Sequence, residues 1–254
     1  MRAWGHPEPG DLDRVVVVSP HLDDAVLGCG LLLAARPGTT VLTVFTGAPP
    51  AYPDPMRPWD AECGFGTGDD VMEVRRAEDR EALARLDAAP EHLGLVEYSY
   101  RPDDAVVPVP EIAEALDRAI IRLDPTLVVM PFGLANPDHV AVHKACLSVR
   151  SGTRSDRAWW CYEEAGYKHI PGQLAWSVAG LFRTGHWPTP VVLPDPGPVA
   201  AERKTEALAC YRSQVRALEA DWDLSAKSGV PEQYWRLAPP PPGWEGLAAA
   251  DPRR

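Results

Sequence analysis

The hydrophobic residues near the start of the chain occur in short unbroken runs rather than in alternation. Residues 15–19 (VVVVS) and 41–46 (VLTVFT) are β-branched runs of this kind, which predict buried parallel strands. The apolar segment 25–35 between them predicts a helix that ends before Pro37 and Gly38. A strand, a helix and a strand within roughly 30 residues form a βαβ unit, so the pattern predicts an α/β fold with a doubly wound sheet.

The same patterns recur along the rest of the chain. Further strands are predicted at 127–131 and 159–162, and further helices at 71–86, 112–123, 139–149 and 200–220. Residues 47–70 are rich in Pro, Gly and aromatic residues, which predicts a long loop with a functional role. We expect one domain over residues 1–237 and a proline-rich tail over residues 238–254.

Composition narrows the class of protein. Of the 254 residues, 45% are hydrophobic and 24% are charged, as in a soluble globular protein. The net charge of −11 disfavours nucleic-acid binding. Neither a membrane span of about 18 apolar residues nor a secretory leader is apparent, so a cytoplasmic protein is expected. The five scattered cysteines contain no C-x-x-C pair and are expected to be buried, reduced thiols.

Candidate metal-binding and catalytic residues are concentrated directly after the first predicted strand, where His21, Asp23 and Asp24 lie within four positions. Ligands bind at the carboxyl ends of strands in doubly wound sheets. A hydrolytic zinc site needs about three nitrogen or oxygen ligands and a carboxylate that takes a proton from water. His21 and Asp24 fit the ligand role and Asp23 the base. The alternative is that both aspartates only cap the following helix.

A second cluster follows the predicted strand 127–131, in the segment Asn136-Pro137-Asp138-His139. His143 comes four residues after His139, so both lie on one face of the predicted helix. Either histidine could be the third metal ligand, and the alternative for each is a surface histidine. Because both clusters occupy a strand end that leads into a helix, we expect them to converge in space.

Four segments resemble motifs of the LmbE-like (PIG-L) family of zinc-dependent N-acetylglucosaminyl deacetylases. Residues 20–24 (PHLDD) are similar to its P-H-x-D-D motif, and residues 75–78 (RRAE) to its R-x-x-E. Residues 136–139 (NPDH) are similar to its H-P-D-H, and residues 204–214 (KTEALACYRSQ) to its C-terminal K-x-x-A-x-x-x-Y-x-S-Q. The resemblance implies a Rossmann-like fold with a mostly parallel sheet and a smaller C-terminal portion.

The resemblance also implies roles for individual residues. His21, Asp24 and His139 would bind Zn²⁺, and Asp23 would be the general base. Arg75 would lie near the sugar hydroxyls, the alternative being an exposed charge paired with Glu78 or Asp79 in its own helix.

Asn136 departs from the family pattern. It stands where the family has a histidine thought to donate a hydrogen bond or a proton to the tetrahedral intermediate. Asparagine can stabilise an oxyanion but cannot transfer a proton. The general acid therefore stays open between His143, a residue of the segment 162–169, and Asp23.

The predicted activity is zinc-dependent hydrolysis of the acetamide of an N-acetylglucosaminyl group. The opening of the chain and its ANPDH variant most resemble deacetylases of teicoplanin-type glycopeptide biosynthesis, so the expected substrate is an antibiotic pseudoaglycone. Trp59, in the aromatic loop, and His143 are candidates for substrate contact, although Trp59 could instead only cover the core. The alternatives are a deacetylase of a small glucosaminyl conjugate, such as a thiol precursor, and a sugar- or metal-binding relative without catalysis. The expected partner is a small glycoconjugate, and the oligomeric state stays open.

Overall fold

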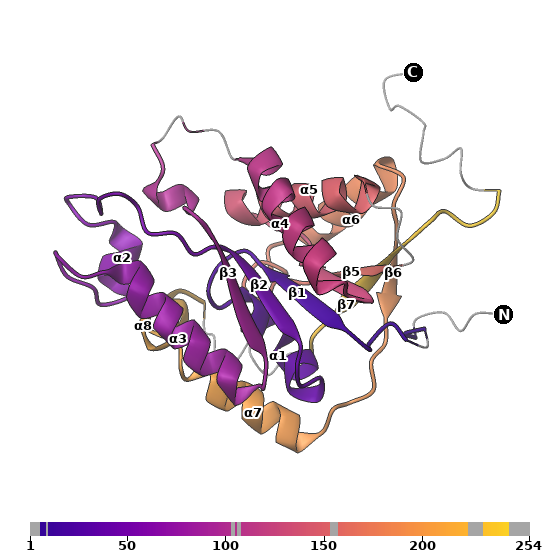
Figure 1. Ribbon diagram of the computed structural model, residues 1–254, viewed down its shortest axis with the longest axis horizontal. Coiled ribbons are helices and arrows are strands. Elements are labelled where there is room, and N and C mark those ends of the chain that lie inside the picture. Colours follow the sequence, from indigo (N-terminus) through magenta and orange to yellow (C-terminus); the bar gives the residue numbers. More distant parts are fainter. Residues whose placement is uncertain are drawn as a thin grey trace.

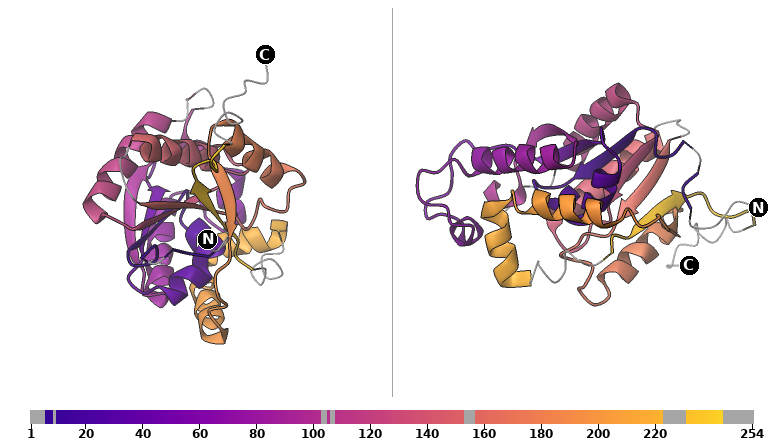
Figure 2. Two further views of the ribbon diagram at one scale, coloured as in Figure 1. Left: turned by 90° about the vertical axis from the view of Figure 1, so that its right-hand side faces the viewer. Right: turned by 90° about the horizontal axis from the view of Figure 1, so that it is seen from below.

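A computed structural model describes residues 6–8, 10–102, 105, 108–152, 157–222 and 231–243, with side chains as far as residue 219 in the last helix. Helices cover both faces of a central sheet (Figures 1 and 2). The seven strands are β1 (Val15–Ser19), β2 (Thr40–Phe45), β3 (Ala89–Leu95), β4 (Leu127–Pro131), β5 (Ala158–Tyr162), β6 (Trp187–Val191) and β7 (Tyr234–Ala238). Their order in the sheet is β3-β2-β1-β4-β5-β7-β6.

The first five strands of the sheet are parallel, and β7 runs antiparallel to both of its neighbours, β5 and β6. Every residue of β1 and β4 is buried. This burial explains their unbroken apolar runs, because a parallel strand covered on both faces has no polar side. The predicted α/β fold with a mostly parallel sheet is confirmed.

The helices form the two outer layers. They are α1 (Asp24–Ala35), α2 (Pro58–Glu62), α3 (Val71–Arg85), α4 (Val109–Leu123), α5 (Pro137–Gly152), α6 (Gln173–Arg183), α7 (Pro198–Leu208) and α8 (Arg212–Trp222). Helices α1, α3 and α7 pack together on one face of the sheet, and α4 and α5 on the other. In α4, Ile112, Leu116, Ala119 and Ile120 are buried, which is the spacing of a helix with one face on the core.

The apolar patterns miss the strands of both sheet edges. Strand β3 has the sequence APEHLGL, in which no residue is fully buried, and β6 has the sequence WPTPV. Proline cannot donate to the ladder and is tolerated at a sheet edge, where pairing is needed on one side only. These edge strands, together with β7 and α6, were not predicted because their positions depend on the neighbours they pack against.

The expected single helix over residues 200–220 is wrong. The chain leaves the helical path between α7 and α8, where Tyr211 is buried and donates from its hydroxyl to Asp79 of α3 at 2.8 Å. A tertiary contact thus overrides the local helix preference. The predicted loop 47–70 also contains the short helix α2. The proline-rich tail was expected from residue 238, which is the last residue of β7, and residues 244–254 lie outside the described residues, so the division into a domain and a tail stays a prediction.

All five cysteines are buried free thiols, as predicted. Within the described part of the chain, no helix is both long and apolar enough to cross a membrane.

The order of strands places two turns side by side. From β1 the chain first adds β2 and β3 on one side, then returns to place β4 on the other side of β1. Open α/β sheets bind ligands at the carboxyl ends of the strands where the order reverses in this way. The residues that follow β1 and β4 are therefore neighbours, although more than a hundred positions separate them in sequence.

Candidate metal-dependent active site

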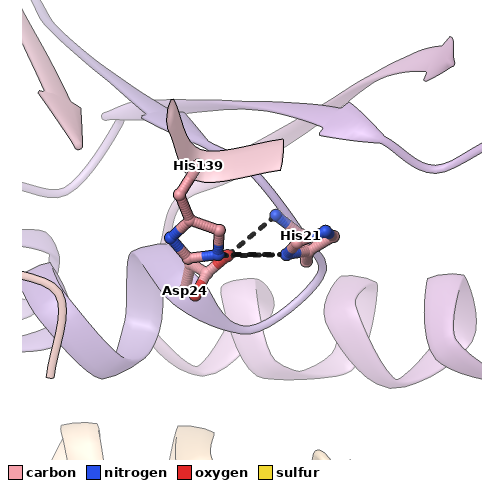
Figure 3. Close-up of side chains that lie close together, drawn as sticks. All are labelled: His21, Asp24 and His139. Atoms are coloured by element: carbon pink, nitrogen blue, oxygen red, sulfur yellow. Dashed lines mark hydrogen bonds and ion pairs between the residues drawn. The ribbon is translucent and has the colours of Figure 1, made fainter. Parts of the chain in front are cut away.

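His21, Asp24 and His139 meet above the carboxyl ends of β1 and β4 (Figure 3). The Nδ1 atom of His21 lies 3.2 Å from Nε2 of His139 and 3.3 Å from Oδ2 of Asp24. The same Asp24 oxygen lies 3.2 Å from Nε2 of His139. Two segments that the sequence predicts to converge thus supply three donor atoms to one point.

The spacing of these donors fits a tetrahedral metal ion. Metal bonds of about 2.0–2.1 Å place two tetrahedral ligand atoms about 3.3 Å apart, which matches the three distances between donors. Two imidazole nitrogens and one carboxylate oxygen are also the donor types of catalytic zinc sites. Among the described residues, this group is the one that could hold a metal ion, and it contains His139 rather than His143.

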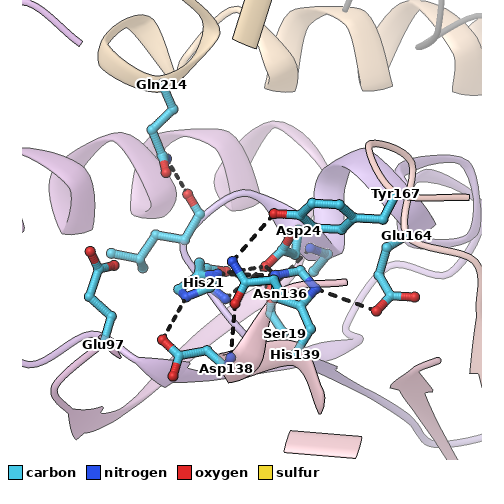
Figure 4. Close-up of polar contacts among 12 residues, drawn as sticks. Ser19, His21, Asp24, Glu97, Asn136, Asp138, His139, Glu164, Tyr167 and Gln214 are labelled. Atoms are coloured by element: carbon cyan, nitrogen blue, oxygen red, sulfur yellow. Dashed lines mark hydrogen bonds and ion pairs between the residues drawn. The ribbon is translucent and has the colours of Figure 1, made fainter. Parts of the chain in front are cut away.

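A carboxylate lies behind each histidine (Figure 4). Oδ2 of Asp138 lies 3.2 Å from Nε2 of His21, and Oε1 of Glu164 lies 3.4 Å from Nδ1 of His139. Nδ1 of His21 and Nε2 of His139 face Asp24 inside the cluster, so a metal bound there would leave the proton of each ring on its outer nitrogen, where Asp138 or Glu164 accepts it. Asp138 and Glu164 therefore select the tautomers in which Nδ1 of His21 and Nε2 of His139 face the cluster.

Glu164 also holds the chain that leads from β4 to α5. Its carboxylate accepts the backbone N–H groups of Phe132, Gly133 and Leu134 at 2.8–3.1 Å. The side chain is 2% exposed. One buried carboxylate thus joins the β4–α5 connection to the proposed ligand His139.

The turn after β1 is held by hydrogen bonds. The backbone N–H of His21 donates to Asp24 at 2.9 Å, and the Ser19 hydroxyl donates to the carbonyl of His21. From α8, the side-chain amide of Gln214 donates to the carbonyl of Leu22 (Figure 4). The alternative reading of Asp23 as a simple helix cap has no support, because its side chain makes no capping hydrogen bond.

The charged groups of the cluster perturb one another. Burial disfavours the protonated forms of His21 and His139, but their contacts with carboxylates outweigh this effect. The pKa of His21 is therefore raised well above its usual value, and the pKa of His139 is raised to about 9. Burial likewise disfavours ionised Asp24, yet the two histidines lower its pKa. For Asp23, burial and then repulsion by Asp24 raise the pKa to about 7. A carboxyl group with that pKa can both take up and release a proton near neutral pH.

Asn136 lies beside the cluster in the turn that begins α5. Its Oδ1 accepts the backbone N–H of Asp138 at 2.8 Å, and its Nδ2 donates to the Tyr167 hydroxyl at 3.3 Å. His143, one helical turn beyond His139, is not among the three clustered donors, and its Nδ1 donates to the carbonyl of Pro131 at 2.9 Å. Burial lowers its pKa.

Arg75 is buried and does not form the helical ion pairs that were the alternative. Its guanidinium binds Asp60 of α2 at 2.9 Å and lies 4.0 Å from Glu97, with 3% of the side chain exposed. Trp59, next to Asp60, is half-buried and packs against the core. Arg75 therefore connects α3 to the aromatic loop, and its contact with a substrate stays a prediction, as does that of Trp59.

Three residues of the site were missed. Asp138 lies inside the N-P-D-H segment and Gln214 inside the C-terminal motif, so the sequence contained a signal for each. Glu164 lies in a segment without a recognisable motif, and only the folded chain brings it to His139.

Known proteins resemble this chain in sequence and in fold. The family model described as GlcNAc-PI de-N-acetylase (PIG-L) matches residues 16–149, more than half of the chain. The 2'-N-acetylparomamine deacetylase of Streptomyces fradiae is 32% identical over 148 residues. That alignment covers 52% of this chain and 50% of the relative, so the chain spans about half the length of this curated relative.

Solved structures of deacetylases match over most of the chain. A triple mutant of the teicoplanin-pathway deacetylase Orf2 has a TM-score of 0.72 at 28% identity, covering 91% of this chain and 100% of that one. A zinc-inhibited form of Orf2, at 24% identity and a TM-score of 0.73 with the same coverage, shows the shared fold. The A40926 pseudoaglycone deacetylase Dbv21 has a TM-score of 0.68 at 25% identity, covering 88% and 96%.

These relatives are deacetylases, in line with the enzyme class predicted from the motifs. The matched family region contains all of β1 except Val15, the three clustered donors and Asp23. By its sequence and by the fold that presents these residues, the chain belongs to the PIG-L family of de-N-acetylases.

Proposed function

We propose that this protein is a zinc-dependent deacetylase that removes the acetyl group from an N-acetylglucosaminyl unit of an antibiotic precursor. The observation that carries the proposal is the set of three donors at tetrahedral spacing, with the side chain of Asp23 beside them. The proximity of Asp23 is supported by the electrostatic effect that Asp24, His21 and His139 exert on it. Family membership and the deacetylase relatives support the reaction type.

His21, Asp24 and His139 would hold the metal, which when bound supplies an activated water and polarises the acetyl carbonyl. Asp23 takes the proton of the attacking water on its carboxylate. The resulting tetrahedral intermediate breaks at its C–N bond, and protonated Asp23 returns the proton to the leaving nitrogen. The products are acetate and the free amine. Asp138 and Glu164 keep the two histidines oriented during this cycle.

The proposed substrate is a glycopeptide pseudoaglycone. Support comes from Orf2 and Dbv21, which match this chain over about nine-tenths of its length and are deacetylases of the teicoplanin pathway and of the A40926 pseudoaglycone. The aromatic loop between β2 and α3, anchored through Asp60 and Arg75, would suit a rigid aromatic aglycone.

A second candidate is a smaller amino-sugar substrate. It is favoured by the paromamine-type deacetylase, which has the higher identity, although over half of the chain. The non-catalytic alternative is disfavoured, because a binding protein has no need of a base beside its metal ligands.

An acetate-release assay tests the function and separates the candidates. Purified protein is incubated with an N-acetylglucosaminyl pseudoaglycone and, separately, with N-acetylparomamine. We expect faster release from the pseudoaglycone, loss of activity after chelation, and recovery on adding zinc. Asp23→Asn is expected to keep the metal and lose nearly all turnover. Full activity in metal-free protein, or in Asp23→Asn, would overturn the proposed mechanism.

A further inference from the structure

The end of the C-terminal motif, residues 204–214, links two helices. The buried Glu78 carboxylate of α3 accepts the backbone N–H of Ser213 at 3.0 Å and its hydroxyl at 2.6 Å. Ser213 lies in the first turn of α8, where backbone N–H groups have no partner within the helix. Glu78 therefore caps α8 from outside, where a negative charge is favourable. Together with the bond from Tyr211 to Asp79, this cap fixes the start of α8 against α3.

Gln214 extends from this fixed helix start to the turn after β1. Its side-chain amide donates a hydrogen bond to the carbonyl of Leu22 (Figure 4). Both residues are buried, so this carbonyl depends on a donor from the protein rather than on water. The end of the C-terminal motif thus connects α3 to the segment that contains His21, Asp23 and Asp24.

Asp23 has no side-chain anchor of its own. Among the described residues, none donates a hydrogen bond to its carboxylate. The direction of the Asp23 side chain is therefore set by its backbone. The Leu22 carbonyl and the Asp23 N–H belong to one planar peptide group, whose N–H donates to the carbonyl of His21 at 3.1 Å. Gln214 holds the other side of the same group, so it fixes the backbone that aims the carboxylate.

Other hydrogen bonds hold the proposed metal ligands of this turn. The backbone N–H of His21 donates to Asp24 at 2.9 Å, and the Ser19 hydroxyl donates to the His21 carbonyl at 2.7 Å. The ring of His21 is held by Asp138. Two separate sets of contacts therefore support the two tasks of the turn, which are metal binding and proton transfer.

We propose that Gln214 is a positioning residue for the general base. By fixing the peptide group that precedes Asp23, it keeps the carboxylate where it takes the proton of the attacking water, and it does not contribute to metal affinity. This inference rests on the proposed deacetylase function. The competing account is that Gln214 only stabilises the fold by pairing a buried carbonyl.

Kinetics of Gln214→Met test the proposal. Methionine keeps the length of the side chain and removes the donor. We expect kcat to fall by about 10–100-fold, the usual effect of removing an orienting partner in an active site, with KM and the zinc dissociation constant nearly unchanged. An unchanged kcat, or a loss of kcat that follows weaker zinc binding, would overturn the proposal.

Thr126→Val is the matched control for stability. The Thr126 hydroxyl donates to the carbonyl of Asp11 at 2.9 Å, directly before β4 and so at the end of the sheet opposite the site. Both variants lose a side-chain donor to a backbone carbonyl, so both should lower the melting temperature of the metal-free protein. Only Gln214→Met should lower kcat. Equal losses of kcat in the two variants would assign the effect to stability and refute the positioning role.

A double variant shows whether Gln214 acts through Asp23. In the Asp23→Asn background no carboxylate remains to be aimed, so Gln214→Met should have little further effect on the residual kcat. If it lowers the residual kcat by the same factor as in the wild-type background, Gln214 acts independently of the base and the proposal is wrong.

Amide hydrogen exchange of the zinc-loaded proteins, followed by NMR, distinguishes failure of this inference from failure of the proposed function. Gln214→Met should speed exchange of the Asp23 N–H by about tenfold, since a hydrogen bond to its peptide group is lost, and leave exchange of the His21 N–H unchanged. Faster exchange at Asp23, in a protein whose wild-type form releases no acetate, would refute the function but support the positioning role. Unchanged exchange and unchanged kcat in the variant, alongside normal wild-type turnover, would refute the role of Gln214.

Discussion

Replacing Glu164 with glutamine is predicted to weaken metal binding far more than it weakens the fold. Glutamine keeps one oxygen, which can occupy the place of Oε1 and still accept from Gly133 and Leu134. The bond lost is the one that the N–H of Phe132 donates to Oε2, and that N–H still donates to the carbonyl of Tyr162 at 3.2 Å. The substitution therefore removes the negative charge behind His139 and leaves no backbone donor without a partner.

The expected magnitudes follow from these contacts. Loss of one hydrogen bond whose donor keeps a second partner costs about 1 kcal/mol in the free energy of unfolding. Loss of the carboxylate behind a metal-binding histidine reduces metal affinity by about 10–100-fold, and the charge makes that contact about twice as strong as a neutral one. Glu164→Ala, by contrast, leaves the N–H groups of Gly133 and Leu134 buried and unpaired, at about 1–3 kcal/mol each.

Two measurements check this prediction. Urea unfolding of the metal-free protein gives the free energy of unfolding, and competition with a chromophoric chelator gives the zinc dissociation constant. Glu163→Gln is the control. Glu163 is next to Glu164 in the sequence, but its carboxylate accepts a hydrogen bond from the Trp235 indole rather than from a group of the site. If Glu164→Gln binds zinc as tightly as the wild-type protein, Glu164 holds only the β4–α5 connection, and the argument about the tautomer of His139 is wrong.

Four further substitutions test the geometry. His139→Ala should lower the zinc content of purified protein to near zero whereas His143→Ala should keep it, and metal analysis that finds the reverse would exchange their roles. Arg75→Met should lower the free energy of unfolding by about 3–5 kcal/mol, because it leaves Asp60 buried without its cation. If urea unfolding shows a change in this free energy within about 0.5 kcal/mol, Arg75 behaves as an exposed helical charge instead. Lys204→Met should cost a similar amount by the same assay, since its amine also lies in a buried ion pair and donates to the carbonyl of Leu27 in α1.

The chemistry of the site was already visible in the sequence. His21, Asp23 and Asp24 follow a strand whose unbroken apolar run identifies it as buried, and His139 opens a helix after a second such strand. In parallel sheets, strand ends that lead into helices gather at one edge, so local pattern and general topology together predicted a shared site. The interior parallel strands β1, β2, β4 and β5 were predictable for the same reason, because burial on both faces leaves a strong signal in sequence.

Other features depended on contacts between distant segments. The edge strands β3 and β6 carry prolines and polar residues that are tolerated only because one side of each strand is unpaired. The break between α7 and α8 follows from the contact of Tyr211 with α3.

Only the tertiary structure decided how the site is supported. The choice of His139 over His143 required the direction of each ring, since both lie on the same helix at compatible spacing. Glu164 and Tyr167 reach the site from a segment that carries no motif, and no local pattern encodes their approach. Residue types in a short segment determine which ligands and bases are available, whereas protonation and orientation depend on buried partners that folding brings into contact.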